Sequence, residues 1–213
     1  MDNSKNEELK VIFLGETFVG KTCLIKAYLE NNFKDKIDST ISASSFIKKI
    51  ETEKGKYTLR IWDTAGQEQY RCLNKIFIKD SQIVIFVYDI TRKKTLEELN
   101  YWYEYSENCL GKGNAVYAVL ANKIDLFDKE NEIKEEYDEL GLKIEYVNVN
   151  EGKDFAEKIE ALFCETSAKE LMTGFSELMI KLVETYYTKN QIVKSKTFKI
   201  EKQGLKKKKI KIC

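Results

Sequence analysis

The sequence has no proline and no histidine, and it contains few arginines and only five cysteines. Without histidine, and with no CxxC spacing among the cysteines, neither a zinc site nor a set of disulfides is predicted. Unpaired cysteines of this kind are typical of reduced thiols in the cytosol. No run of about 18 apolar residues occurs, so no segment is predicted to span a bilayer. The polar start, MDNSKNEELK, also lacks the apolar core of a signal peptide.

An excess of charge of one sign is also missing, because 36 basic and 35 acidic side chains leave a net charge of +1. The distribution is uneven, however. Ten lysines and one glutamate fall within residues 189–213, which carry +9, so residues 1–188 carry −8. An acidic body with a basic tail does not fit a nucleic-acid-binding protein, whose basic side chains usually lie on the folded domain. We therefore expect no nucleic-acid partner.

Short apolar runs alternate with longer amphipathic segments along the chain. The apolar runs are Val11–Leu14, Tyr57–Trp62, Ile83–Tyr88, Val116–Leu120 and Ala161–Cys164, and the amphipathic segments are Thr22–Asn31, Thr95–Cys109, roughly Asp154–Glu160 and Leu171–Thr188. Continuous apolar runs indicate strands that are buried on both faces, as in parallel sheets. The alternation predicts an α/β fold with a mostly parallel sheet and helices on both faces. Residues Phe46–Glu53 are predicted to form an edge strand, in a hairpin with Tyr57–Trp62.

The length suits one folded domain with extensions at its ends. We expect a short polar N-terminus over residues 1–8, the domain over residues 9–188, and a flexible lysine-rich tail over residues 189–213. Within the domain, residues 127–150 are dense in charge (DKENEIKEEYDE). Because burying these charges would be costly, we expect them to form an exposed insertion.

Residues 15–22 read GETFVGKT and match the GxxxxGK[ST] phosphate-loop pattern. The match follows a predicted strand and opens a predicted helix, which is the context that the pattern requires. In such a loop the backbone amides and the helix N-terminus hold phosphates, Lys21 reaches the β- and γ-phosphates, and the Thr22 hydroxyl binds Mg²⁺. The alternative is an ordinary turn containing glycine. The candidate nucleotide-binding residues are Gly15, Glu16, Thr17, Phe18, Val19, Gly20, Lys21, Thr22 and Cys23.

A second motif, WDTAGQE, occupies residues 62–68 at the end of a predicted strand. The Asp63 carboxylate can hold Mg²⁺ through water, and Gly66 can offer an unobstructed amide to the γ-phosphate of a triphosphate. Gln67 can orient the attacking water, which makes it the candidate catalytic residue. Taken alone the motif could be a plain strand end and turn, but its pairing with the phosphate loop favours the functional interpretation.

Two further motifs predict specificity for guanine. In NKID, residues 122–125, the Asp125 carboxylate can accept hydrogen bonds from N1 and N2 of guanine, whereas adenine would leave that charge unpaired. In ETSAK, residues 165–169, the backbone can present the Ala168 amide to guanine O6. All four motifs follow predicted strands, so they meet at the sheet edge where open α/β folds bind ligands. The candidate nucleotide-binding residues here are Asn122, Lys123, Asp125, Ser167, Ala168 and Lys169.

With these motifs in this order, residues 9–188 resemble the Ras superfamily of small GTPases. WDTAGQE, followed by Tyr70–Leu73 and Tyr88–Thr91, resembles the Rab branch in particular. The resemblance implies a P-loop small G-protein fold with a six-stranded sheet and five helices, two switch segments, Mg²⁺ as cofactor, and GTP or GDP as bound nucleotide. It also implies that Thr40, nineteen residues after Lys21, binds Mg²⁺ and the γ-phosphate.

The same resemblance places Phe33, twelve residues after Lys21, against the guanine ring. The predicted metal ligands are thus Thr22, Thr40 and Asp63. Further implications are an exchange factor, a GTPase-activating protein and effectors as partners, a monomeric state, a role in vesicular traffic, and a location on the cytoplasmic face of an intracellular membrane with a cytosolic pool. The chain's arginines are Arg60, Arg71 and Arg92, and none is expected in a position to act in cis, so intrinsic hydrolysis should be slow.

Several positions depart from the Rab pattern. Phe18 replaces a small residue of the phosphate loop, and Ser42 stands where Rabs usually have glycine. The resemblance implies an effector-facing aromatic cluster of Phe46, Trp62 and Phe77. Phe46 comes one residue late for this cluster, so strand alternation predicts that its side chain lies on the opposite face of the strand.

The tail combines the basic residues Lys206–Lys209 and Lys211 with a terminal thiol, Cys213. Position 210 is isoleucine, so the CaaX prenylation motif is absent. By resemblance to Rabs, we expect geranylgeranylation of Cys213 by the escort-dependent enzyme. One lipid chain and a basic patch together would hold the protein at an anionic membrane. The alternative is a solvated, frayed end.

Two other interpretations of the whole chain stay open. One is an ATP-dependent P-loop kinase or ATPase, although an adenine site would have no use for Asp125. The other is a scaffold that binds nucleotide without hydrolysing it, which Phe18 and the unusual first switch segment suggest. Turnover of GTP distinguishes the scaffold from the GTPase.

Overall fold

The chain forms a single twisted sheet of six strands in the order β2-β3-β1-β4-β5-β6. The computed structural model describes residues 8–30, 40, 43–64, 71–126, 146–170 and 174–191. The strands are β1 (Glu8–Leu14), β2 (Ser44–Thr52), β3 (Gly55–Asp63), β4 (Ile83–Asp89), β5 (Val116–Asn122) and β6 (Leu162–Glu165). Among these six strands, only the β2–β3 pair is antiparallel. The predicted mostly parallel α/β sheet is therefore confirmed.

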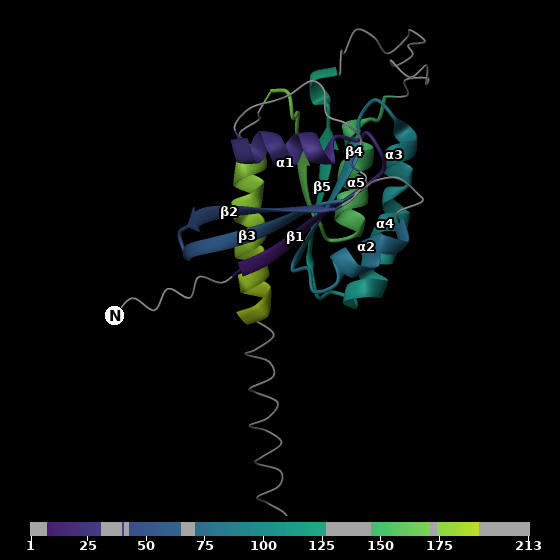
Figure 1. Ribbon diagram of the computed structural model, residues 1–213. Coiled ribbons are helices and arrows are strands. Elements are labelled where there is room, and N and C mark those ends of the chain that lie inside the picture. Colours follow the sequence, from purple (N-terminus) through teal and green to yellow (C-terminus); the bar gives the residue numbers. More distant parts are fainter. Residues whose placement is uncertain are drawn as a thin grey trace, which may run out of the picture.

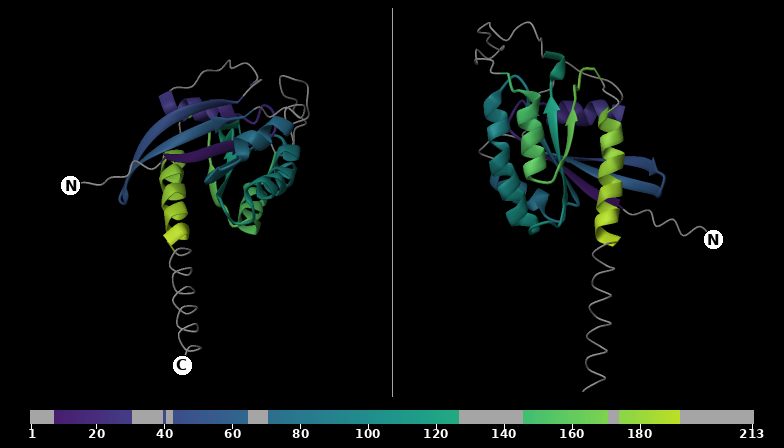
Figure 2. Two further views of the ribbon diagram at one scale, coloured as in Figure 1. Left: turned by 60° about the horizontal axis from the view of Figure 1, so that its bottom comes forward. Right: turned by 180° about the vertical axis from the view of Figure 1, so that it is seen from behind.

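Helices cover both faces of this sheet, as Figures 1 and 2 show. One buried hydrophobic cluster lies beneath α1 (Lys21–Glu30) and the C-terminal helix over residues 174–191. A second cluster lies beneath α2 (Arg71–Ile78), α4 (Leu99–Leu110) and α5 (Val149–Lys158). Two clusters on opposite faces account for the continuous apolar runs, since every residue of β4 and β5 is buried. No helix within the described ranges is long and apolar enough to cross a membrane.

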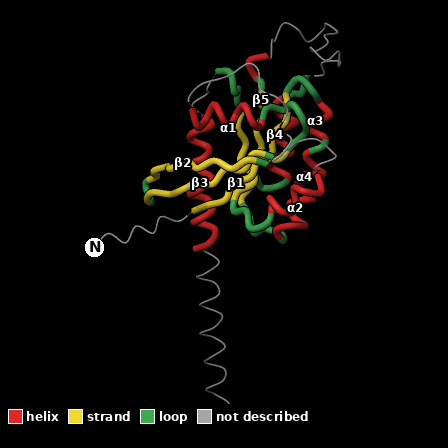
Figure 3. The backbone as a smooth tube through the Cα atoms, viewed as in Figure 1, coloured by secondary structure: helices red, strands yellow, loops and turns green. Residues whose placement is uncertain are grey.

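The β2–β3 hairpin projects beyond the body (Figure 3). Ser45 pairs with Trp62, and Phe46 pairs with Ile61. Phe46 therefore packs toward the cluster beneath α1, whereas Trp62 packs on Phe77 on the other face, with ring centroids 5.4 Å apart. Phe46 thus lies on the face of the strand that the alternation predicts. It does not join Trp62 and Phe77, so the aromatic cluster that the Rab resemblance implies contains only these two of its three members.

Several element boundaries differ from the expectation. The helix α2 was not predicted, and the segment Thr95–Cys109 is divided at Glu98 into α3 (Lys93–Glu97) and α4. The C-terminal helix runs to residue 191, beyond the expected domain end at 188. A short 3₁₀ helix, Ile124–Leu126, follows β5.

The charged insertion expected over residues 127–150 does not reach residue 150. Val147 is fully buried, and its amide donates to the Ile90 carbonyl over 2.7 Å. The Asn148 side chain then caps α5 by accepting from the Asn150 amide over 2.9 Å. This cap starts α5 at Val149, five residues earlier than expected, because asparagine satisfies an amide of the first turn. Residues 127–145 lie outside the described part of the chain.

Candidate nucleotide and metal site

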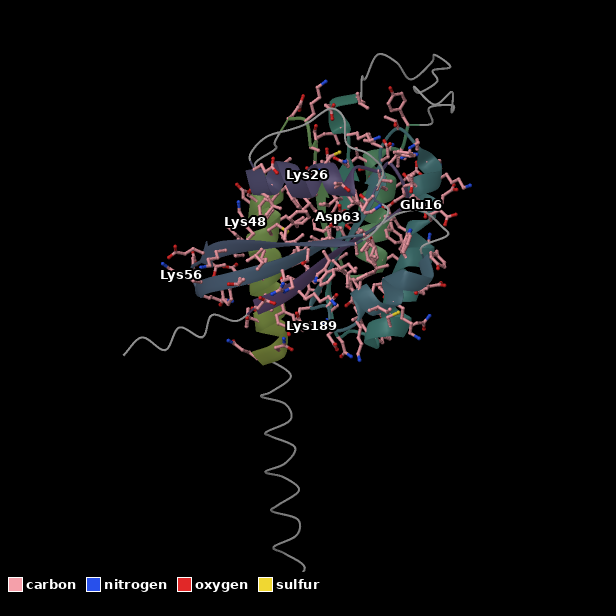
Figure 4. The ribbon with its side chains drawn as sticks, viewed as in Figure 1. Glu16, Lys26, Lys48, Lys56, Asp63 and Lys189 are labelled. Carbon is pink, nitrogen blue, oxygen red and sulfur yellow. The ribbon has the colours of Figure 1, made fainter. Side chains whose placement is uncertain are left out.

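The described residues of the four sequence motifs meet at one edge of the sheet, at the carboxyl ends of β1, β3, β5 and β6. Figure 4 shows Asp63 below α1, whereas Lys189 lies at the far end of the C-terminal helix. The edge is held together by bonds between the loops. The Thr166 amide donates to the Ala121 carbonyl over 2.8 Å, and the Ile124 amide to the Thr166 carbonyl over 3.3 Å. The NKID and ETSAK motifs thus form one surface.

Two glycines allow the loop over residues 15–20 to turn tightly between β1 and α1. Gly15 has φ +144°, and a Cβ there would lie 2.2 Å from the Val87 carbonyl oxygen. Gly20 has φ +94°, and a Cβ there would lie 2.3 Å from Asn122 Nδ2. Any other residue would meet both steric and conformational strain at these positions. The glycines of the pattern therefore let the loop approach β4 and the NKID motif closely.

Lys21 begins α1 and turns its side chain back into this loop. Its Nζ atom donates to the carbonyl oxygens of Gly15 and Glu16, each over 2.8 Å. Burial lowers the pKa of Lys21 to about 8, an effect that the nearby charges of Asp63 and Glu16 partly offset. A buried ammonium whose hydrogen bonds go to neutral carbonyls is incompletely compensated, so the site favours an anion beside it. A phosphate fits this requirement.

Thr22, Thr40 and Asp63 come together although they stand far apart in the sequence. The Thr22 hydroxyl donates to Asp63 Oδ2 over 2.7 Å and lies 2.7 Å from the Thr40 hydroxyl. Asp63 is 2% exposed, and its other oxygen, Oδ1, has no hydrogen-bond partner. Burial raises the pKa of this carboxyl despite the hydrogen bond from Thr22 and the charge of Lys21.

These properties fit a magnesium ion. Mg²⁺ prefers oxygen ligands and is usually bound by one or two carboxylates together with phosphates of the substrate. The orphaned Asp63 oxygen and the two threonine hydroxyls supply such donors. Among the described residues, no three His, Cys, Asp or Glu side chains are grouped so that they could hold a metal ion by themselves. The ion would need ligands from a bound nucleotide.

At the other end of the edge, the candidate guanine corner is formed by Asp125 and Ser167. The Ser167 hydroxyl donates to Asp125 Oδ1 over 2.6 Å, and it accepts from the amides of Lys169 and Glu170, each over 3.2 Å. Ser167 is almost fully buried and Ala168 is 6% exposed. The serine thus fixes both the carboxylate and the turn that carries the Ala168 amide. Asn122 joins this corner to the phosphate loop, because its Nδ2 donates to the Val19 carbonyl over 2.7 Å.

A charged cluster beside the phosphate loop was not predicted from the sequence. Asp89, at the end of β4, is fully buried and pairs with Lys123 Nζ over 2.7 Å and Arg92 Nε over 3.0 Å. Arg92 Nη2 also donates to the Thr17 carbonyl over 3.1 Å. An arginine thus lies beside the phosphate loop, which the sequence did not predict. The position of Asp89 and Arg92 just after a central strand was the available signal.

The remaining predicted residues are placed as follows. Phe18 has φ +62° and is 52% exposed, and the Glu16 carboxylate accepts from Trp102 Nε1 of α4 over 3.0 Å. Cys23 is half-buried in α1, and burial raises the pKa of its thiol. Phe33, Gly66, Gln67 and Cys213 lie outside the described residues.

Comparison with known proteins gives consistent matches. A profile of the Ras family matches residues 10–188. The chain is 35% identical over 175 residues to the Ras-related protein Rab-22A of Homo sapiens, covering 82% of this chain and 81% of the relative. It is 32% identical over 188 residues to Rab-18-B of Danio rerio, covering 87% and 84%, and 36% identical over 173 residues to Rab-21 of Homo sapiens, covering 81% and 69%. The matched region contains all the described residues of the site.

Proposed function

The chain belongs to the Ras family of small GTPases, and from this premise we propose that it is a Rab-like switch in vesicular membrane traffic. It binds GTP with Mg²⁺, hydrolyses it to GDP and phosphate, and recruits effectors only in the GTP-bound form. An exchange factor replaces GDP with GTP, and an activating protein accelerates hydrolysis. The switch acts as a monomer at the cytoplasmic face of an intracellular membrane.

The observation that carries this proposal is the link between the phosphate loop and the guanine corner. Asn122 bonds the phosphate loop at Val19, and Asp125 is oriented by Ser167 a short distance along the same edge. A carboxylate fixed in this way is complementary to the two donors of guanine and has no partner on adenine. This arrangement supports the GTPase over an ATP-dependent enzyme.

In the proposed mechanism, Lys21 and the amides of the loop hold the β- and γ-phosphates, while Asp125 and the Ala168 amide hold the base. Mg²⁺, held by Thr22, Thr40 and Asp63, would neutralise charge on the phosphates. Thr40 and Gly66 contact the γ-phosphate only in the triphosphate state, so loss of that phosphate releases both switch segments. Gln67 orients the attacking water in line with the γ-phosphate.

The position of Arg92 supports the proposal that intrinsic hydrolysis is slow. Its guanidinium bonds Asp89 and the Thr17 carbonyl, so the contacts seen hold it to the protein and leave it unavailable to the γ-phosphate. Positive charge beyond that of Lys21 and Mg²⁺ would then be supplied by an activating protein in trans.

Gln67→Leu is expected to slow GTP hydrolysis by at least about tenfold, because the attacking water loses its orienting group. Binding of GTP should stay nearly unchanged, since the side chain acts on the water. Single-turnover hydrolysis in Mg²⁺ measures the rate, and fluorescent GTP titration measures binding. The matched control is Gln191→Leu, an exposed residue at the end of the C-terminal helix, which should hydrolyse GTP at the wild-type rate. Equal hydrolysis rates for Gln67→Leu and wild type would contradict the role of Gln67, and absence of hydrolysis by the wild-type chain would support the nucleotide-binding scaffold.

Cys213→Ser is expected to move the protein from membranes to the cytosol, because removal of the lipid leaves only the lysines to bind the bilayer. GTP hydrolysis in solution should not change. Fractionation of cells that express an N-terminally tagged chain measures the distribution, with Cys109→Ser of α4 as the control. Membrane retention of Cys213→Ser, or an unmodified Cys213 by mass spectrometry, would contradict the proposed anchor.

A further inference from the structure

Arg92 connects two segments that are 75 residues apart in the sequence. It follows β4 and occupies the N-cap position of α3, where its side chain is 16% exposed. The guanidinium donates from Nε to Asp89 Oδ2 over 3.0 Å and from Nη2 to the Thr17 carbonyl over 3.1 Å. A planar guanidinium can serve two acceptors in this way because its donors are held in a fixed fork.

The Asp89 carboxylate gives this connection a rigid base. Besides Arg92 it accepts from the Thr91 amide over 3.0 Å and the Thr91 hydroxyl over 2.7 Å, and Lys123 Nζ lies 2.7 Å from it. Burial alone would raise the pKa of Asp89, but Lys123 and Thr91 hold it below its ordinary value. The Asp89 carboxylate therefore stays ionised and fixed, and its hydrogen bond with Arg92 holds the guanidinium in place.

Arg92 contacts the carbonyl of the Thr17–Phe18 peptide, and Phe18 has a strained backbone conformation. Phe18 has φ +62°, a region that a bulky side chain enters only at a cost. The Thr17–Phe18 peptide bond is trans, so its carbonyl and amide point in opposite directions. A bond that fixes the Thr17 carbonyl toward Arg92 therefore also fixes the Phe18 amide on the side away from Arg92.

We propose that Arg92 is a positioning residue that clamps the Thr17–Phe18 peptide and keeps the Phe18 amide directed at the phosphates of the bound nucleotide. The clamp compensates for phenylalanine at a position where glycine would adopt the same backbone without strain. Phe18 and Arg92 thereby act as a pair that sets the rate of nucleotide release. The inference rests on the proposed binding of guanine nucleotides.

The test is a double-mutant cycle on the full chain loaded with fluorescent GDP in Mg²⁺. Arg92→Gln is expected to release GDP about tenfold faster than wild type, the size of effect expected for a lost hydrogen bond to a charged group. Arg92→Lys should also release GDP faster, because an ammonium carries its donors on one atom and cannot reproduce the two separate positions from which Arg92 Nε and Nη2 donate. Once Phe18→Gly has removed the strain, Arg92→Gln should accelerate release by clearly less than it does in the otherwise wild-type chain.

Three further measurements decide the outcome. Arg60→Gln removes a partly exposed arginine of β3 whose partner is Glu8 at the start of β1, and it should release GDP at the wild-type rate. Wild-type release by Arg92→Gln and Arg92→Lys would overturn the clamp. The same acceleration by Arg92→Gln with and without Phe18→Gly would also overturn it, and would show a merely structural arginine. Failure of the wild-type chain to retain GDP at all would instead refute nucleotide binding, and with it the premise.

Discussion

Asp125→Asn is expected to lower the affinity for GDP by about 100-fold to 10,000-fold, because two charged hydrogen bonds worth roughly 1.5–3 kcal/mol each are lost. The amide can accept only through one oxygen, and its NH₂ group faces the donors of guanine. The Ser167 hydroxyl, which donates to Asp125 Oδ1 over 2.6 Å, also loses a charged acceptor. Competition of GDP against a fluorescent guanine nucleotide in Mg²⁺ measures the change.

The same variant should bind xanthosine diphosphate better than the wild type does. Xanthine carries a carbonyl where guanine has its 2-amino group, so the new amide has an acceptor to donate to. The matched control is Asp154→Asn, an exposed position of α5, which should leave both affinities unchanged. If Asp125→Asn binds GDP as tightly as wild type, or if the wild-type chain binds ATP comparably to GTP, guanine specificity through Asp125 is wrong.

Thr22→Asn is expected to lower the affinity for GTP by about 100-fold, the size of effect expected when a metal ligand or its support is removed. The affinity for GDP should fall by clearly less. The Thr22 hydroxyl bonds Asp63 and lies beside Thr40, so a longer amide displaces three proposed ligands together. The effect is larger for GTP because the proposed Thr40 contact to phosphate exists only with the triphosphate. Equilibrium titration with fluorescent GDP and a non-hydrolysable GTP analogue measures the ratio.

Chelation of Mg²⁺ supplies the second arm of this experiment. EDTA should accelerate release of GDP from the wild-type chain, whereas Thr22→Asn should already release it quickly and respond little. Thr185→Asn, at an exposed position of the C-terminal helix, is the control and should respond to EDTA as the wild type does. If Thr22→Asn binds GTP as tightly as wild type and responds fully to EDTA, the proposed role of Thr22 in the metal site is wrong.

The central strands and the first helix could be predicted because their signals are local. The apolar runs inside β4 and β5 exist because both faces of these strands are buried, and the phosphate-loop pattern ends on the first two residues of α1. The short helix α2 could not be predicted in this way. Its place depends on contacts such as that of Phe77 with Trp62, which belong to the assembled fold. The burial of Val147 depends likewise on its bond to Ile90, 57 residues earlier in the chain.

By itself, the sequence determined the chemistry of the candidate site. Each motif is a short run whose residue types and spacing limit what it can do, from the glycines around Lys21 to the carboxylate of Asp125. The alternation of a strand, also a local property, determined which face Phe46 occupies. Only the tertiary structure decided that Thr22, Thr40 and Asp63 meet, and that Arg92 reaches the Thr17 carbonyl. These contacts join distant positions, and they arise only when the parallel strands β1, β3 and β4 bring their carboxyl ends to one edge.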